Sequence, residues 1–358
     1  MTSRIEQILH DARRRKVFSG AAWSCGTADS VEDSGVVGTL AWDGPPATKD
    51  SWWDLASVTK PIVGLAVMAL VDTGRLALDD TVADHLPHYA GTDKATLTVR
   101  QLLTHTSGIP GQTPLYRWCP SRDKLLEAIR TIALVSAPGT TVHYSSAGFI
   151  ILGMMAEAAS GLPLDKLVSG TVTAPVGMSQ TMFTLPPELR WMAAATEDCP
   201  WRGRLVQGTV HDENAEVLGG ICGHAGLFAP LTDLEALGRM LCAGGQRGGA
   251  TLLSPAALAV MTTPATDQLN LRRSLAWQGR DGLASPAGEL AGALSYGHTG
   301  FTGTSIWVDP DAGRYVVLLT NRVHPSRLGP GIARTRTLVH NTAFGSTSTA
   351  GDTAAGRQ

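Results

Sequence analysis

The chain has 358 residues, of which 43% are hydrophobic and 17% charged, and its formal net charge at pH 7 is −2. A chain of this length and apolar content can bury a substantial core and would ordinarily form about two domains. Its nearly balanced charge argues against a nucleic-acid-binding surface and against a strongly acidic ligand.

The first predicted elements are a helix followed by a strand. Residues 4–9 are helix-like and contain an acid, and the basic run 13–16 precedes a short apolar stretch over 17–25. This arrangement loosely imitates a secretion signal, but Ser19 and Gly20 interrupt the apolar stretch and an acid-containing helix precedes it. We therefore expect an N-terminal helix, then the first strand of a sheet, and a cytoplasmic protein.

The most informative segment is Ser-Val-Thr-Lys at residues 57–60, directly before an apolar run over 61–71. Pro61 suits the first turn of a helix, and apolar residues on every side predict that this helix is buried. Ser57 would lie at the positive end of the helix dipole, with Lys60 one turn later on the same face. A serine hydroxyl beside a buried amine is an activated nucleophile, provided that the amine loses its proton. The spacing alone is weak evidence, because Ser-x-x-Lys most often marks a solvated helix start.

A second segment supplies a phenol near a helix entrance. Pro-Gly at residues 138–139 leads into Tyr144, Ser145 and Ser146, and another buried helix is predicted over 147–155. Tyr144 is therefore expected on the turn before that helix.

A third segment lies near the other end of the chain. Residues 296–303 carry glycines on both sides of His298 and Thr299, and they precede a strand predicted over 304–308. Glycines at such positions let another backbone or a ligand approach a sheet edge closely. Asp-Pro-Asp-Ala-Gly at 309–313 predicts the turn of a hairpin that joins 305–308 to 315–320.

Several other residues are better explained by structural roles. Residues 211–214, His-Asp-Glu-Asn, lack the spacing of a metal site and are expected to form a hydrogen-bonded loop that lines or braces the cleft. His105 is expected to cap or brace a local turn. The five cysteines are widely spaced and include no Cys-x-x-Cys pair, which favours free buried thiols over disulfides or a metal site. Trp118, Trp201 and Trp307 could shape a pocket, but the core is the preferred interpretation for each.

The three segments, in this order, resemble the serine β-lactamase and penicillin-binding family. The resemblance is to the branch with class C β-lactamases, D-alanyl-D-alanine carboxypeptidases, related esterases and some biosynthetic acyltransferases. Residues 57–60 match the Ser-x-x-Lys motif of the family, residues 144–146 its Tyr-x-Asn motif, and residues 298–300 its Lys/His-Thr-Gly motif. Three ordered motifs are far more specific than one, and the resemblance covers roughly residues 5–343.

The resemblance implies an α/β (α+β) fold of the β-lactamase/transpeptidase type, in which helices flank an antiparallel sheet and a mainly helical lobe is inserted. We expect a single catalytic domain over residues 1–345. The sheet lobe would take about 1–75 and 216–345, and the helical lobe about 76–215. Residues 346–358, rich in Ser, Thr, Gly and Ala, are expected to be a disordered tail.

Two residues depart from the β-lactamase pattern. Ser146 stands where β-lactamases of this branch usually carry asparagine, and a hydroxyl offers fewer hydrogen bonds than an amide. This change disfavours antibiotic hydrolysis. His298 replaces the lysine of class C enzymes, so the fixed positive charge that would meet a substrate carboxylate is weakened at neutral pH. The second change favours substrates without a carboxylate.

The mechanism that the resemblance implies is acyl transfer through a covalent intermediate. Ser57 would attack an ester or amide carbonyl, while Lys60 and Tyr144 share the proton. His298 is a further catalytic candidate, and the backbone N–H groups of Ser57 and Phe301 would form the oxyanion hole. The substrate-binding candidates are Ser146, Thr299 and Gly300.

The function expected first is that of an intracellular transacylase or esterase in natural-product metabolism. Its partners would be a small-molecule ester or amide acyl donor and an amine or alcohol acceptor, with no nucleic acid, membrane, metal or cofactor. The enzymatic alternative is a D-amino-acid peptidase, DD-carboxypeptidase or β-lactamase, for which the cytoplasm is a poor location. A non-catalytic sensor or binding protein that keeps an acylatable serine is a third alternative, disfavoured because all three motifs are retained. The sequence leaves open the donor, the acceptor, the choice between water and another acceptor, and the oligomeric state.

Overall fold

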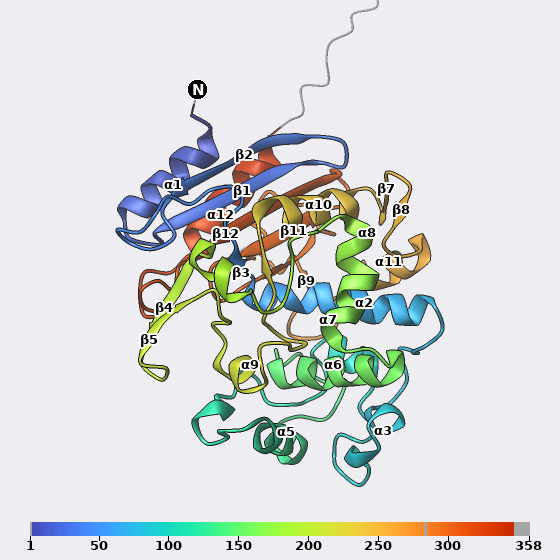
Figure 1. The fold of residues 1–358 in the computed structure, drawn as a ribbon. Helices are drawn as coiled ribbons and strands as arrows, with labels where there is room; N and C mark the ends of the chain where they lie inside the picture. The colour runs from blue at the N-terminus through green and yellow to red at the C-terminus, as the bar shows by residue number, and fades with distance from the viewer. Residues whose placement is uncertain (1, 283–284, 347–358) are drawn as a thin grey trace, which may run out of the picture.

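A six-stranded antiparallel sheet forms the centre of one half of the molecule (Figure 1). The computed structural model describes residues 2–282 and 285–346, so the predicted tail, 346–358, lies outside the described residues except for Ser346. The strands, in their order across the sheet, are β2 (Val31–Gly38), β1 (Gly20–Thr27), β12 (Arg314–Thr320), β11 (Ser305–Asp309), β10 (Tyr296–Thr299) and β9 (Gln278–Gly279). Every neighbouring pair is antiparallel, which confirms the predicted sheet.

Helices cover both faces of this sheet, because successive side chains of a strand point to opposite faces. On β12, Val316 and Leu318 belong to an apolar cluster with α1 (Arg4–Arg14) and α12 (Ala333–Gly345). Val317 and Leu319 belong to the other, larger apolar cluster, which includes α10 (Leu231–Cys242). The fold is therefore an antiparallel sheet flanked by helices, as expected.

The N-terminal helix is part of this packing. Ile5, Leu9 and Ala12 are buried and share one face of α1, and Ser3 caps the helix by accepting the Glu6 N–H at 3.1 Å. The structure confirms a helix over 4–9, extends it to Arg14, and starts the first strand at Gly20.

The helix predicted from the apolar run 61–71 is α2 (Thr59–Asp72), and it lies under the sheet in the middle of the molecule (Figure 1). It contacts α6 (Ser146–Ser160), the second predicted buried helix, and α11 (Pro255–Thr262). Both α2 and α6 are buried on nearly all sides, as expected for helices without a polar face.

The remaining elements are short. The other α-helices are α3 (Val82–His85), α4 (Val99–Leu103), α5 (Arg122–Thr131), α7 (Leu164–Val168), α8 (Ala174–Val176) and α9 (Glu213–Val217). A π-helical segment over Ser169–Thr173 joins α7 to α8, and 3-10 turns span Ala56–Val58, Pro87–Tyr89, Leu115–Arg117 and Pro187–Met192. Three two-stranded sheets pair β3 (Trp53–Asp54) with β6 (Phe228–Ala229), β4 (Ala195–Cys199) with β5 (Arg204–Gln207), and β7 (Gln246–Arg247) with β8 (Ala250–Thr251). The division of the chain into a sheet lobe and a helical lobe stays a prediction.

The hairpin predicted around 309–313 is present between β11 and β12. The Asp309 carboxylate accepts the backbone N–H groups of Asp311 and Ala312, each at 3.2 Å, which fixes the turn. The core interpretation is right for Trp307, which is fully buried, but wrong for Trp118 and Trp201, whose exposed fractions are 58% and 44%. These two side chains come from loops, where composition alone does not indicate depth.

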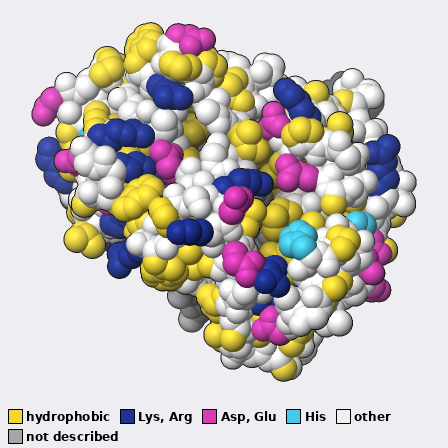
Figure 2. Space-filling view, turned by 60° about the horizontal axis from the view of Figure 1, so that its bottom comes forward, with side chains coloured by type: hydrophobic (Ala, Val, Ile, Leu, Met, Phe, Trp, Pro, Cys, Tyr) yellow, Lys and Arg dark blue, Asp and Glu magenta, His cyan; other side chains and the backbone are white. Residues whose placement is uncertain are grey.

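The cysteines and the surface agree with the composition. All five cysteines are free thiols, and four of them are buried. Acidic and basic side chains are interspersed on the face shown in Figure 2. Within the described residues, no single helix is long and apolar enough to cross a membrane; by length and composition alone, the bent pair Ser146–Ser160 and Leu164–Val176 together passes that test.

Candidate active site

Ser57 lies in the 3-10 turn Ala56–Val58, directly before α2, so it precedes the helix rather than opening it. The preceding residue, Ala56, has a φ of 47°, which is unfavourable for a residue with a Cβ. Asp54 holds this turn, because its Oδ1 accepts the Ala56 N–H and its Oδ2 accepts the His211 N–H, both at 2.7 Å. A strained turn that its surroundings hold in place is typical of functional sites.

Lys60 is fully buried in the first turn of α2. Its Nζ lies 3.2 Å from Ser57 Oγ and 3.0 Å from the carbonyl oxygen of His224, and it donates a hydrogen bond to each. The same Nζ lies 4.9 Å from the centre of the Tyr144 ring. The predicted contact between the hydroxyl and the amine is therefore present, and the phenol ring stands beside the amine.

Tyr144 stands on the turn before α6, as predicted. The next residue, Ser145, is the N-cap of the helix: its Oγ accepts the Gly148 N–H at 3.2 Å and donates to the Pro110 carbonyl at 2.8 Å. The Ser145 N–H donates to Nδ1 of His105 at 3.1 Å, and the His105 ring lies 4.6 Å from the Tyr144 ring. His105 therefore braces the turn that carries Tyr144, at a longer range than the local turn expected from the sequence.

His298 lies on β10, opposite Ile306 of β11. Its Nδ1 donates to the Thr299 carbonyl at 2.9 Å, and its Nε2 is buried without a hydrogen-bond partner among the described residues. Burial and the neighbouring cations of Lys60 and Arg273 hold the pKa of His298 well below its usual range. The imidazole is therefore neutral, with Nε2 as a free acceptor.

The two residues predicted to supply the oxyanion donors line the same cavities. Within residues 2–282 and 285–346, neither the Ser57 N–H nor the Phe301 N–H donates to a protein acceptor. Gly300 precedes Phe301 in a turn packed tightly against the nucleophile segment, where a Cβ would come within 2.0 Å of Thr304 Oγ1. Thr304 Oγ1 in turn donates to the Leu55 carbonyl at 2.9 Å, so the turn and the nucleophile segment are held together.

Ser57 lines two cavities. The first, here called the β10 cavity, has a volume of about 460 Å³ and is lined by residues that include Ser57, Tyr144, His298, Thr299, Gly300 and Phe301. The second, here called the α9 cavity, has a volume of about 240 Å³ and is lined by residues that include Ser57, Gln112, Tyr116, Ser146, Asp212 and Phe301. The structure thus gathers the predicted residues around Ser57, with His298 lining the β10 cavity and Ser146 lining the α9 cavity.

A buried polar network lies behind Lys60. His224 accepts the Lys60 hydrogen bond with its backbone carbonyl, and its ring lies between Cys222 Sγ (3.1 Å from Nδ1) and Asp212 Oδ1 (2.9 Å from Nε2). Burial opposes the charged imidazole, but Cys222 and Asp212 outweigh it and raise the pKa of His224 to about 10. The loop 211–214 therefore braces the cleft, as its sequence indicated.

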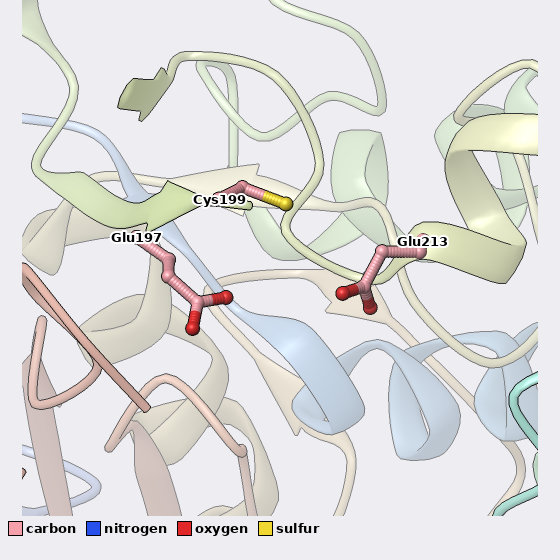
Figure 3. Close-up of side chains that lie close together, drawn as sticks. All are labelled: Glu197, Cys199 and Glu213. Carbon is pink, nitrogen blue, oxygen red and sulfur yellow. The ribbon is translucent and has the colours of Figure 1, made fainter. Parts of the chain in front are cut away.

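A cluster of potential metal ligands lies beside the α9 cavity. Glu197 and Cys199 of β4 face Glu213 at the start of α9 (Figure 3). Both carboxylates already form ion pairs with the Arg327 guanidinium, and Glu197 also bonds to His211 at 3.0 Å. Because a protein cation already pairs with both carboxylates, the residues are better explained as a structural ion-pair network.

The sequence analysis did not identify three arginines that line the site. Arg273, Arg322 and Arg336 line the β10 cavity together with His298. No motif marks these arginines, and they come from three separate segments. The only signal in the sequence is the presence of arginine near elements that turn out to be buried.

Comparisons with known proteins support the family and the fold. A family model described as Beta-lactamase matches residues 7–341. A protein of Escherichia coli (strain K12), provisionally named D-alanyl-D-alanine carboxypeptidase, is 31% identical over 311 residues, which cover 78% of this chain and 70% of that protein. EstCE1, a hydrolase with promiscuous acyltransferase activity, matches with a TM-score of 0.78 and 22% identity, covering 95% of this chain and 97% of its own. A class C beta-lactamase matches with a TM-score of 0.78 and 18% identity, covering 96% and 95%.

Proposed function

The chain belongs to the beta-lactamase family of serine hydrolases and acyltransferases, and we propose that it transfers acyl groups through Ser57 as a transacylase or esterase. The observation that carries this proposal is the 3.2 Å contact between Lys60 Nζ and Ser57 Oγ at the junction of two cavities. The substrate would be a small-molecule ester or amide.

The proposed reaction begins with attack of Ser57 Oγ on the substrate carbonyl. Lys60 and Tyr144 share the hydroxyl proton, and Tyr144 passes a proton to the leaving group. The backbone N–H groups of Ser57 and Phe301 stabilise the developing oxyanion, a contribution of about 3 kcal/mol per donor in comparable enzymes. Neutral His298 orients the substrate as a hydrogen-bond acceptor through Nε2, next to Thr299 and Gly300.

An acceptor other than water is part of the proposal. The β10 and α9 cavities both reach Ser57, so a donor in one cavity leaves the other open for an amine or alcohol. An acceptor held there competes with water through its high effective concentration. We propose a role in natural-product metabolism, while the cytoplasmic location stays a prediction from the sequence.

A second candidate function is that of a D-amino-acid peptidase. It is favoured by the name of the E. coli relative, which covers 78% of this chain at 31% identity. Release of D-alanine from D-alanyl-D-alanine by the wild-type protein, and its loss in Ser57→Ala, would support this candidate over the esterase. The sensor alternative requires an acyl-enzyme that forms and never turns over.

The nucleophile is tested with a fluorophosphonate probe and mass spectrometry of the labelled peptide. We expect Ser57→Ala to abolish labelling, because the reactive hydroxyl is removed. Ser146→Ala is a matched control: Ser146 lines the same α9 cavity as Ser57, but Lys60 donates to Ser57. Labelling that persists in Ser57→Ala, or that disappears only in Ser146→Ala, would move the nucleophile elsewhere.

The acceptor is tested by product analysis with 4-nitrophenyl acetate as the donor. Adding a small amine should divert the acyl group from acetate to an amide, in proportion to the amine concentration. The amide formed in the presence of the Ser57→Ala variant gives the uncatalysed background. If no amide exceeds that background at any amine concentration, the transacylase proposal fails and the esterase remains.

A further inference from the structure

Asp54 is a buried carboxylate that the proposed reaction does not use. It is the last residue of β3, pairs with Phe228 of β6, and is only 3% exposed. Its carboxylate accepts two backbone N–H groups and, within residues 2–282 and 285–346, forms no ion pair. Burial raises the pKa of Asp54, because the ionised form is costly to keep away from water. A buried acid without a cation partner is rare, and here its hydrogen bonds indicate what it does.

The carboxylate of Asp54 holds the turn that carries the nucleophile. Its Oδ1 accepts the N–H of Ala56, the residue before Ser57, at 2.7 Å. Ala56 has a φ of 47°, which a residue with a Cβ keeps only when its surroundings enforce it. The Ser57 N–H, the first predicted oxyanion donor, belongs to the peptide group that directly follows Ala56. The direction of that N–H therefore depends on the hydrogen bond from Ala56 to Asp54.

The backbone carbonyl of Asp54 holds the segment of the second donor. It accepts the Thr302 hydroxyl at 2.8 Å, and Thr302 directly follows Phe301, whose N–H is the second predicted oxyanion donor. Thr302 is buried, so water does not compete for this bond. Asp54 is thus bonded to both segments that supply the oxyanion hole, through its side chain on one side and its backbone on the other.

His211 adds a third connection between Asp54 and the donors. Its N–H donates to Oδ2 of Asp54 at 2.7 Å, and its ring stacks on the Phe301 ring, with the centroids 5.7 Å apart and an interplanar angle of 26°. Nε2 of His211 lies 3.0 Å from a carboxylate oxygen of Glu197, which fixes the ring. The carboxylate of Asp54 therefore also holds the residue against which Phe301 packs.

We propose that Asp54 is a positioning residue for the oxyanion hole, which sets the Ser57 and Phe301 N–H groups relative to each other through its bonds to Ala56, His211 and Thr302. This inference rests on the proposed function and adds to it the residue that keeps the two donors aligned. Donors aimed at the oxyanion act mainly in the transition state. Loss of the Asp54 carboxylate should therefore slow the reaction while leaving substrate binding nearly unchanged.

The first test is Asp54→Asn, which keeps the shape of the side chain but replaces one acceptor oxygen with an NH₂ group. Either the Ala56 N–H or the His211 N–H then loses its acceptor. We expect kcat for 4-nitrophenyl acetate to fall by about 10- to 100-fold, since small misplacements of catalytic groups have costs of that size, while KM changes by less than about twofold. A rise in KM at unchanged kcat, or no change in either, contradicts the proposal.

Asp233→Asn is the matched control for that substitution. Asp233 is 4% exposed, accepts the Gln180 N–H at 2.9 Å and the Thr181 hydroxyl at 2.8 Å, and lines neither the β10 cavity nor the α9 cavity. It therefore reports the cost of placing an amide at a buried carboxylate position away from Ser57. We expect Asp233→Asn to keep the wild-type kcat per folded molecule. A fall in kcat as large as that in Asp54→Asn would show a general loss of structure and overturn the inference.

The second test leaves the carboxylate intact, so it decides the inference even if Asp54→Asn does not fold. Thr302→Val removes the hydroxyl that donates to the Asp54 carbonyl at almost the same volume, and Thr302→Ser keeps the hydroxyl. We expect kcat to fall by about fivefold in Thr302→Val, the usual effect of one hydrogen bond, and to recover in Thr302→Ser. Equal kcat in all three proteins, or a loss that Thr302→Ser does not recover, contradicts the proposal.

The inference and the proposed function can fail separately. A fluorophosphonate labels Ser57 without any ester substrate, and the charge that develops on its phosphoryl oxygen meets the same two donors. If the wild-type protein is labelled at Ser57 but turns over no ester, the proposed function fails, and the labelling rates still decide the inference. Slower labelling in Asp54→Asn than in Asp233→Asn supports the positioning role, and equal rates overturn it. No labelling of the wild-type protein at Ser57 rejects the proposed function and the inference together.

Discussion

Nε2 of His224 lies 2.9 Å from Oδ1 of Asp212, and the backbone carbonyl of the same histidine accepts a hydrogen bond from Lys60. The ion pair therefore fixes the loop that positions the proposed base.

This ion pair makes stability depend on pH. The pKa of His224 is raised from 6.5 to about 10 in the folded protein. Its contribution to the free energy of unfolding is therefore full below about pH 6.5 and is lost as the pH rises towards 10. The pKa of Asp212 is lowered from 3.8, so its contribution is present above about pH 4. We expect His224→Gln to reduce the free energy of unfolding more at pH 6 than at pH 9.5, as measured by urea denaturation. His10→Gln, at an exposed histidine, is the control. A loss of stability in His224→Gln that grows with pH would contradict the raised pKa of His224.

Lys60 and Tyr144 are predicted to act on one proton path. Lys60→Ala and Tyr144→Phe should each lower the turnover of a nitrophenyl ester by about 10² or more, the usual contribution of general acid–base catalysis. The double variant should lose much less than the product of the two losses, because the Tyr144 ring lies 4.9 Å from the amine that contacts Ser57. Steady-state kinetics on the four proteins provides the test. Losses that multiply would show two independent roles.

Gly300 sets the distance between the Phe301 N–H and the nucleophile turn. In Gly300→Ala, the new methyl group would lie 2.0 Å from Thr304 Oγ1 and 2.6 Å from the Leu55 carbonyl oxygen, so the turn must move. We expect kcat to fall by about 10² to 10³, the cost of losing one oxyanion donor. Gly170→Ala, where a Cβ meets nothing within 4 Å, should retain the wild-type kcat. Normal kcat in Gly300→Ala would place the oxyanion elsewhere.

The fold was predictable where the pattern is local. The apolar runs 61–71 and 147–155 became α2 and α6, and Asp309 to Gly313 became a hairpin turn, because each depends on neighbouring residues only. Strand β9 has two residues and forms by pairing with β10, which no local pattern indicates. The exposure of Trp118 and Trp201 likewise depends on where their loops lie in the fold.

The site was predictable to the extent that motifs mark it. Ser57, Lys60 and His298 stand within recognisable motifs, and the structure gathers these motifs around one cleft. The charge of that cleft was not predictable, because Arg273 and Arg336 reach it from segments far apart in sequence. The same holds for the strain at Ala56, since its φ of 47° depends on the Asp54 carboxylate and on His211.

Ser146 offers a test of why this cleft should differ from that of a β-lactamase. Ser146, the first residue of α6, lines the α9 cavity together with Ser57. A hydroxyl donates once and accepts through the same oxygen, whereas an asparagine amide has two N–H donors and a separate carbonyl acceptor for the acyl-amide side chain of a penicillin. We expect the wild-type protein to turn over nitrophenyl acetate faster than benzylpenicillin, and Ser146→Asn to accelerate acylation by benzylpenicillin several-fold or more, since one such hydrogen bond contributes about 1 kcal/mol. Mass spectrometry of the acyl-enzyme over time gives both rates, with Ser146→Ala as the control for a smaller side chain. Rapid penicillin hydrolysis by the wild-type protein, or no gain in Ser146→Asn, would show that position 146 does not limit β-lactam recognition.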